Sequence, residues 1–77
     1  MSEQKETRYL AAFGKRFAEI RKSRGLTQEA LADKAGITVL SIGFIEQGRR
    51  WPRIATLHKL ATCLNVSIDE LFKGLKS

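Results

Sequence analysis

Apolar residues recur along this chain at the three- and four-residue spacing that places side chains on one face of a helix. The first such stripe consists of Leu10, Phe13, Phe17 and Ile20. It runs into the basic sequence RKSRG, where cations suit the carbonyl end of a helix and Gly25 can stop it. The pattern predicts a helix over about residues 9–24. Residues 1–7 are polar and have nothing to bury, so we expect a flexible leader before one folded domain over residues 8–77.

A short second helix is predicted directly after this stop. Thr27 is a suitable N-cap for the segment QEALADKA, because its hydroxyl can accept a backbone N–H of the first turn. The residues expected to face inward are Ala30, Leu31 and Ala35. Gly36 then supplies the left-handed conformation that ends a helix and turns the chain.

The next segment, ITVLSIGFIEQG, is apolar on both faces when it is interpreted as a helix. Thr38 is its expected N-cap and Gly48 its end, so the helix spans about residues 39–47. Ile42 and Ile45 fall on one side. The other side carries Val39, Leu40, Gly43 and Phe44. A chain of this length cannot bury a helix on every side, so the second apolar face predicts a partner.

Two further helices complete the pattern, and the whole is an all-α chain of five helices. The loop RRWPRIA precedes the first of them, because Pro52 disfavours helix at the residue before it. Thr56 is expected to cap LHKLATCL, which ends at Asn65. Its buried face would consist of Leu57, Leu60, Ala61 and Leu64. Ser67 and Glu70 form a capping box that opens the last helix, SIDELFKG.

The C-terminal segment carries more apolar side chains than one side of so short a helix can bury. They are Val66, Ile68, Leu71, Phe72 and Leu75. We therefore expect some of them to meet a second copy of the chain, in a homodimer.

Charge narrows the class of partner. Fourteen Lys and Arg against eight Asp and Glu give a net charge of +6. The excess lies in the segment predicted to fold, and such a field favours nucleic acid or an anionic surface. We predict no membrane partner, because no apolar run approaches a membrane span and the polar N-terminus is unlike a signal peptide. A cytoplasmic protein is the resulting prediction.

Catalytic and metal chemistry have no support in the sequence. There is no paired-carboxylate, phosphate-loop or metal-ligand arrangement, so we expect no enzyme and no cofactor. One cysteine cannot build a disulfide framework, and no His or Cys spacing suits zinc. Cys63 is interpreted as a small core residue, with redox sensing as the alternative, and His58 as exposed.

The second and third predicted helices, joined by a turn containing glycine, have the pattern of a helix-turn-helix. The segments LTQEALADKAGI, SIGFIEQG, WPR and LATCLNVSIDELF, in this order, resemble the Cro and phage-repressor type of helix-turn-helix domain, the XRE family. The resemblance covers residues 10–74. Within the family, the chain looks most like the small restriction–modification controller proteins. It implies a five-helix lambda-repressor-like regulator that binds double-stranded DNA as a homodimer on a palindromic operator. Residues 38–47 would be the recognition helix, and no small-molecule effector is expected.

The resemblance also assigns roles to single residues. Gln28 matches a glutamine at the start of the second helix, where backbone N–H groups favour a DNA phosphate. The positions expected near base edges or the adjacent backbone are Thr38, Val39, Leu40, Ser41, Gly43 and Phe44. Arg53, after Pro52, matches an arginine that reaches the DNA backbone or a narrow minor groove. Arg49 and Arg50 lie in the same loop and are expected to bind phosphate as well. Arg21 and Glu46 match a structural ion pair that joins the first helix to the third.

The chain departs from the family pattern on its groove-facing surface. Family members often place Gln, Arg, Ser or Asn there, because these side chains match hydrogen-bonding groups on base edges. Apolar side chains can contact thymine methyl groups but offer little such readout. Specificity would then depend on Thr38, Ser41, DNA shape and the loop arginines. The alternative function is an adaptor that binds another protein through this apolar face.

Two features of the loop also have alternative interpretations. Its arginines are either phosphate ligands or an ordinary solvated loop. Trp51 is expected to pack as a lid over the third and fourth helices, and the alternative is that it stacks on a base.

Overall fold

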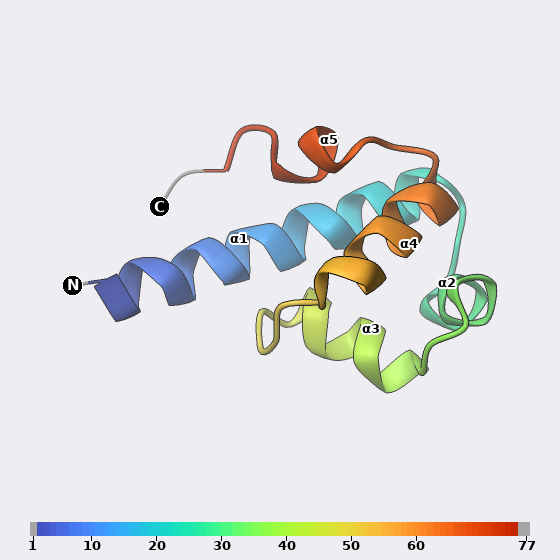
Figure 1. The fold of residues 1–77 in the computed structure, drawn as a ribbon, viewed down its shortest axis with the longest axis horizontal. Helices are drawn as coiled ribbons and strands as arrows, with labels where there is room; N and C mark the ends of the chain where they lie inside the picture. The colour runs from blue at the N-terminus through green and yellow to red at the C-terminus, as the bar shows by residue number, and fades with distance from the viewer. Residues whose placement is uncertain (1, 76–77) are drawn as a thin grey trace.

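The computed structural model describes the backbone of residues 2–75 and the side chains of residues 5–75. Its helices are α1 (Ser2–Ser23), α2 (Gln28–Ala35), α3 (Val39–Glu46), α4 (Ile54–Leu64) and α5 (Ile68–Phe72). No strand occurs in the described range, and the predicted all-α fold is confirmed. Figure 1 shows α1 as the longest element, with α3 and α5 packed on different sides of it. None of the helices in this range is long and apolar enough to span a bilayer.

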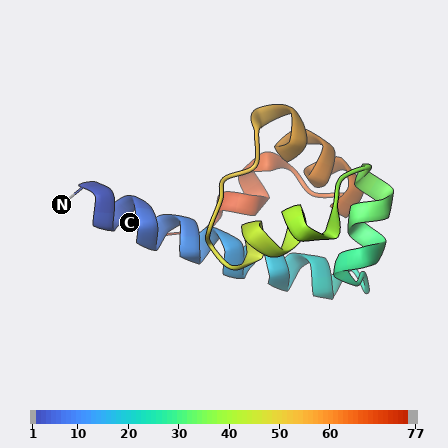
Figure 2. The ribbon, with the colours of Figure 1, turned by 90° about the horizontal axis from the view of Figure 1, so that it is seen from below.

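The first helix starts earlier than predicted. It begins at Ser2 and has 22 residues, so the predicted start at residue 9 is wrong, and residues 2–7 are not separate from the helix. The Glu, Gln and Lys residues of SEQKE are strong helix formers, and adding residues to a helix that already exists is favourable. Figure 2 shows the resulting N-terminal end of α1 projecting past the other helices. The remaining residue of the predicted leader, Met1, lies outside the described residues.

The core lies where the five helices meet. Its largest fully buried side chains are Phe13, Phe17, Leu31, Ile42, Leu60, Leu64 and Leu71. The predicted inward faces of α3 and α4 are confirmed, and so is that of α1 at Phe13, Phe17 and Ile20, whereas Leu10 is only half-buried against the core. In α2 the prediction was wrong at Ala30, which is exposed, whereas Ala32 is buried. The reason is helical geometry, because Ala32 lies on the same face as Leu31 and Ala35 and Ala30 lies around the other side.

Side-chain caps fix the start of three helices. The hydroxyls of Thr27, Thr38 and Ser67 each accept the backbone N–H of the residue three positions later, at 3.0–3.1 Å. The N-caps predicted for α2, α3 and α5 are therefore confirmed. Of the capping box predicted at α5, the described residues show the bond to the Ser67 hydroxyl, whereas the Glu70 carboxylate pairs with Arg16. Glycine and asparagine end two helices as expected, because Gly36 and Asn65 adopt left-handed conformations with φ of 70° and 57°.

The start of α4 differs from the prediction. The helix begins at Ile54 with Arg53 as its N-cap, and Thr56, the predicted N-cap, lies in its first turn. Pro52 restrains only the residue before it, so a helix can begin soon after the proline. No side chain caps this helix, because Arg53 makes no capping hydrogen bond.

Trp51 belongs to an aromatic cluster on α1 and α5. Its ring centroid lies 5.1 Å from that of Phe13, 6.0 Å from that of Tyr9 and 6.2 Å from that of Phe72. The packing role predicted for Trp51 is confirmed, but its ring partners lie on α1 and α5 and not on α3 and α4. This contact anchors the loop between α3 and α4 to the body of the domain.

Candidate nucleic-acid interface

The outer face of α3 is exposed, as its pattern predicted. Val39 is 43% and Leu40 is 62% exposed, whereas Ile42 and Ile45 on the opposite face are at most 2% exposed. Gly43 and Phe44 are half-buried at the margin of the outer face. The two predicted faces of this helix are therefore confirmed. An exposed leucine and valine at the start of a helix give that surface an apolar character without any contribution to the core.

Two hydroxyls lie at the N-terminal edge of this face. Thr38 Oγ1 accepts the backbone N–H of Ser41, and the two side-chain oxygens lie 2.9 Å apart in a hydrogen bond. One of the two hydroxyl hydrogens is used between them. The pair therefore offers a single hydroxyl hydrogen to any outside acceptor.

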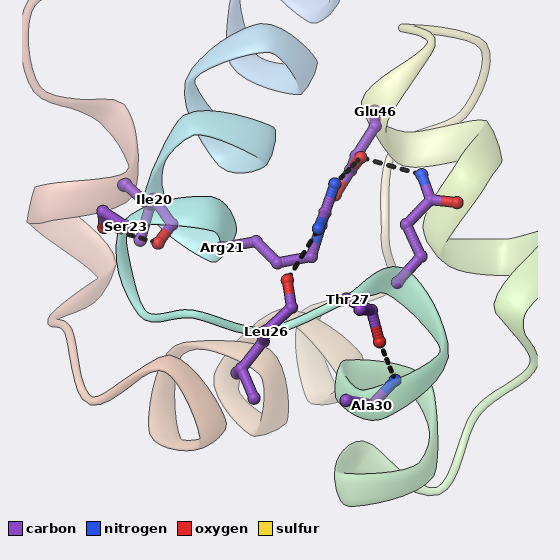
Figure 3. A network of polar contacts seen from close by, with 8 residues as sticks. Ile20, Arg21, Ser23, Leu26, Thr27, Ala30 and Glu46 are labelled. Atoms are coloured by element: carbon purple, nitrogen blue, oxygen red, sulfur yellow. Dashed lines mark hydrogen bonds and ion pairs between the residues drawn. The ribbon is translucent and has the colours of Figure 1, made fainter.

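One buried ion pair joins α1 to α3 beside the start of α2 (Figure 3). Arg21 Nε lies 2.6 Å from Glu46 Oε2, and Arg21 Nη2 lies 3.0 Å from Glu46 Oε1. Both side chains are only 8% exposed. The remaining guanidinium nitrogen, Nη1, donates to the carbonyl oxygen of Leu26 at 2.7 Å. The hydrogen bond with Glu46 raises the pKa of Arg21, and the predicted pair is confirmed.

Gln28 joins the same network, which its pattern did not indicate. Its amide nitrogen Nε2 donates to Glu46 Oε1 at 2.8 Å, and the side chain is half-buried. An amide group carries two N–H donors, so one donor remains after this bond. The structure thus gives Gln28 a role in holding α2 against α3, in addition to the phosphate contact predicted for it.

The basic loop follows the end of α3 directly. The guanidinium carbons of Arg49 and Arg50 lie 5.0 and 5.1 Å from the centre of the Phe44 ring, within the range of a cation–π interaction. Arg53 is exposed at the start of α4. Among the side chains of residues 5–75, no carboxylate forms an ion pair with any of these three arginines. Their positive charges are therefore available to an outside anion.

A shallow cleft of about 290 Å³ connects the outer face of α3 to the start of α4. Its lining residues are Ile37, Ser41, Ile45, Arg50, Trp51, Pro52, Arg53 and Thr56. The lining combines two arginines and two hydroxyls with apolar side chains, so the cleft continues the basic surface from the loop to α4.

The C-terminal surface differs from its prediction. Leu71, one of the five residues predicted at a dimer interface, is completely buried inside the single chain, so that assignment is wrong. The other four are half-buried against the core, and Phe72 packs on Phe13 with ring centroids 4.8 Å apart. The cause is the position of α5 between α1 and α4, because residues on two of its sides then reach the core.

Arg16 and Arg24 fix the C-terminal part of the chain in ways that the sequence did not indicate. Arg16 Nε donates to the Glu70 carbonyl at 2.8 Å, and Arg16 Nη2 lies 3.2 Å from Glu70 Oε2. Arg24 Nε donates to the carbonyl of Leu64 at the end of α4, at 2.8 Å. The position of an arginine in the sequence does not indicate which distant backbone carbonyl its side chain will bind.

The structure places Cys63 and His58 as the sequence predicted. Cys63 is half-buried and packs against the core, and His58 is exposed. Neither contributes to the surface formed by α3 and the basic loop.

The arrangement of α2 and α3 is that of a helix-turn-helix, in which the second helix exposes its outer face beside a basic loop. A model of the helix-turn-helix family matches residues 17–71. The chain belongs to this family, of the XRE type, and is a transcriptional regulator with a helix-turn-helix DNA-binding domain.

Individual relatives agree with this assignment. YazB of Bacillus subtilis, an uncharacterised regulator of this type, is 44% identical over 59 residues, which cover 77% of this chain and 86% of that protein. The regulator PuuR of Escherichia coli is 42% identical over a match that covers 77% of this chain and 32% of its own length. The crystal structure of the restriction–modification controller protein C.AhdI from Aeromonas hydrophila is similar with a TM-score of 0.79 and 40% identity, over 82% of this chain and 96% of that one. The family resemblance predicted from the sequence is confirmed.

Proposed function

We propose that the chain binds double-stranded DNA as a homodimer on a palindromic operator, with residues 38–47 as the recognition helix in the major groove. The observation that carries the proposal is the exposed outer face of α3 beside three arginines without acidic partners. A groove-entering helix must have an exposed face, and cations beside it bind the flanking phosphates. The similarity to C.AhdI supports a small regulator of the controller type.

The expected contacts with DNA come from two groups of residues. The groove-facing group is Thr38, Val39, Leu40, Ser41, Gly43 and Phe44. The phosphate-binding group is Gln28, Arg49, Arg50 and Arg53, the last of which lies at the uncapped start of α4. The first group can donate few hydrogen bonds, so sequence preference would come from thymine methyl contacts and from DNA shape.

The homodimer would use the apolar residues of the C-terminus that remain half-buried. They are Val66, Ile68, Phe72 and Leu75. A two-fold pair places identical recognition helices on one side of the duplex, where successive major grooves are about 34 Å apart. Each subunit would then bind one half-site of the palindrome.

An adaptor that binds protein is the second candidate, and the exposed Val39 and Leu40 favour it. A gel-shift experiment with random duplex DNA at low and moderate salt, followed by selection of the bound sequences, separates the two functions. DNA binding with enrichment of a palindrome supports the regulator. Absence of any shift at low salt would leave the adaptor as the better account.

Removing a loop arginine should weaken binding to every duplex. We expect Arg53→Ala to make the slope of log affinity against log salt shallower by about one unit, because one phosphate contact and its released counterion are lost. Fluorescence anisotropy over a salt series measures the slope. Lys59→Ala is the matched control, because this exposed cation lies on α4 away from the loop. Equal slopes in the wild type and Arg53→Ala would remove Arg53 from the phosphate contacts.

Leu40→Ala tests base contact by the apolar face. The side chain is 62% exposed, so we expect the free energy of unfolding to change by less than about 0.5 kcal/mol. Affinity for the selected duplex should fall by about 1 kcal/mol, and replacing the contacted thymine by uracil should abolish the difference. Ile54→Ala, at the exposed first residue of α4, is the control. A loss that is equal on all sequences would argue against contact with thymine methyls.

Self-association should depend on the C-terminal apolar residues. We expect sedimentation at micromolar concentration to show a dimer for the wild type and a monomer for Leu75→Lys, because the new charge would be buried in the interface. Operator binding should weaken in parallel. For the sedimentation measurement, Ile54→Lys provides a control with the same charge on another exposed apolar residue. A wild type that stays monomeric both free and on DNA would contradict the dimer.

A further inference from the structure

Phe44 is in contact with two cations at the end of α3. It lies on the last turn of α3, and the guanidinium carbons of Arg49 and Arg50 lie 5.0 and 5.1 Å from its ring centre. The face of an aromatic ring carries negative electrostatic potential, which attracts a cation placed over it. One ring thus holds two neighbouring arginines that would otherwise repel each other and move freely in solvent.

The backbone at the end of α3 creates this contact. The N–H of Arg49 donates to the carbonyl of Phe44 at 2.9 Å, and the N–H of Gly48 donates to that of Ile45 at 3.1 Å. These are the two bonds of a Schellman motif, with Gly48 left-handed at φ 71°. In a Schellman motif, the residue after the left-handed glycine is commonly apolar and contacts the residue that Phe44 represents here. In this chain the residue after the glycine is Arg49, and its guanidinium makes the contact with Phe44.

The turn itself is fixed against α1. A Cβ atom at Gly48 would lie 2.7 Å from Ala11 Cα, so the glycine backbone packs directly on the first helix. Trp51, two residues beyond Arg49, is held in the aromatic cluster with Tyr9 and Phe13. The segment that carries both arginines is therefore anchored at its two ends, and the ring of Phe44 restrains the side chains between them.

We propose that Phe44 is a positioning residue, which holds Arg49 and Arg50 in place for DNA phosphates and does not itself contact a base. The inference rests on the proposed DNA-binding function, but it removes Phe44 from the groove-facing group named there and gives it a different role from Leu40. Leu40 is 62% exposed, whereas Phe44 is half-buried and its ring is occupied by two guanidinium groups. Restraining two long side chains before binding lowers the entropy that is lost when they are fixed on phosphate.

The test compares Phe44→Leu, which keeps an apolar side chain, with Phe44→Tyr, which keeps the ring. We expect Phe44→Leu to weaken binding to every duplex by about tenfold, and Phe44→Tyr to stay within about twofold of the wild type. The salt slope should be unchanged in Phe44→Leu, because both cations remain. It should become shallower by about two units in the double variant Arg49→Gln/Arg50→Gln. In that double background, Phe44→Leu should have no further effect.

A measurement without DNA separates this inference from the proposed function. Aromatic ring currents should shift the NMR signals of the Arg49 and Arg50 side chains in the free wild type, and Phe44→Leu should remove the shift. Unshifted wild-type signals, or Phe44→Leu binding like the wild type, would overturn the positioning role alone. A loss in Phe44→Leu that is confined to one base pair and persists in the double background would show base contact instead. A wild type that binds no duplex would overturn the proposed function, and this inference with it.

Discussion

Glu46→Ala should lower the free energy of unfolding by about 3–5 kcal/mol, because it leaves the buried guanidinium of Arg21 without its carboxylate. The carbonyl of Leu26 would be the only acceptor left among the three partner atoms of Arg21. Gln28 would lose its acceptor at the same time. A domain of this size has a total stability of about 4–12 kcal/mol, so the expected loss is a large fraction of the total. Urea denaturation followed by circular dichroism measures the change.

Two controls separate the buried pair from charge in general. Glu19→Ala removes an exposed carboxylate from α1 and should change stability by less than about 0.5 kcal/mol. The double variant Arg21→Met/Glu46→Leu replaces both charges with apolar groups and should recover much of the loss. The raised pKa of Arg21 favours the folded state at every pH below its ordinary range, and this contribution is lost only in strong alkali. The loss in Glu46→Ala should therefore be the same at neutral and mildly alkaline pH. A loss no larger than that of Glu19→Ala would contradict the structural role.

Gly14→Ala should destabilise the domain by about 1–3 kcal/mol or more, although the same change in a free helix is favourable. A Cβ atom at this position would lie 2.3 Å from the carbonyl oxygen of Ile45 and 2.8 Å from that of Glu46. Both are backbone atoms, so α1 and α3 would have to move apart to admit the methyl group. Thermal unfolding of the two proteins measures the difference.

Gly43→Ala is the matched control for this substitution. It also lies inside a helix, but its Cβ would have only the flexible side chain of Gln47 nearby, at 3.8 Å. We expect a gain of about 0.5–1 kcal/mol there, because alanine restricts the unfolded chain and favours the helix. Similar effects of the two substitutions would show that α1 and α3 do not approach each other as closely as the structure indicates.

Local patterns were enough to predict most of the secondary structure. The caps at Thr27, Thr38 and Ser67 were found because capping depends on neighbours within three residues. The Arg21–Glu46 pair came from the family resemblance, since nothing in the local sequence joins residues so far apart. The start of α1 at Ser2 was missed because helix propensity differs by only a small free energy per residue between weak and strong helix formers. Whether the helix extends into residues 2–7 is therefore decided by the packed part of the helix that follows.

Features that depend on tertiary packing could not be predicted. The burial of Leu71 follows from where α5 lies, and the small size of Gly14 matters only because α3 crosses α1 at that point. The outer face of α3 was predicted as a whole, but the contact of Phe44 with Arg49 and Arg50 was not. That contact requires the left-handed turn at Gly48, which reverses the chain and returns the arginines to the helix.

The most direct test of the central claim is the ratio of affinities for two duplexes at moderate salt. One is the sequence that the wild-type protein enriches from random DNA, and the other is a scrambled duplex of the same composition. Sequence-specific binding through α3 predicts that the enriched duplex is bound at least about 10³-fold more tightly, as in other specific DNA-binding proteins. A ratio near one, or the absence of any enriched sequence, would contradict the account.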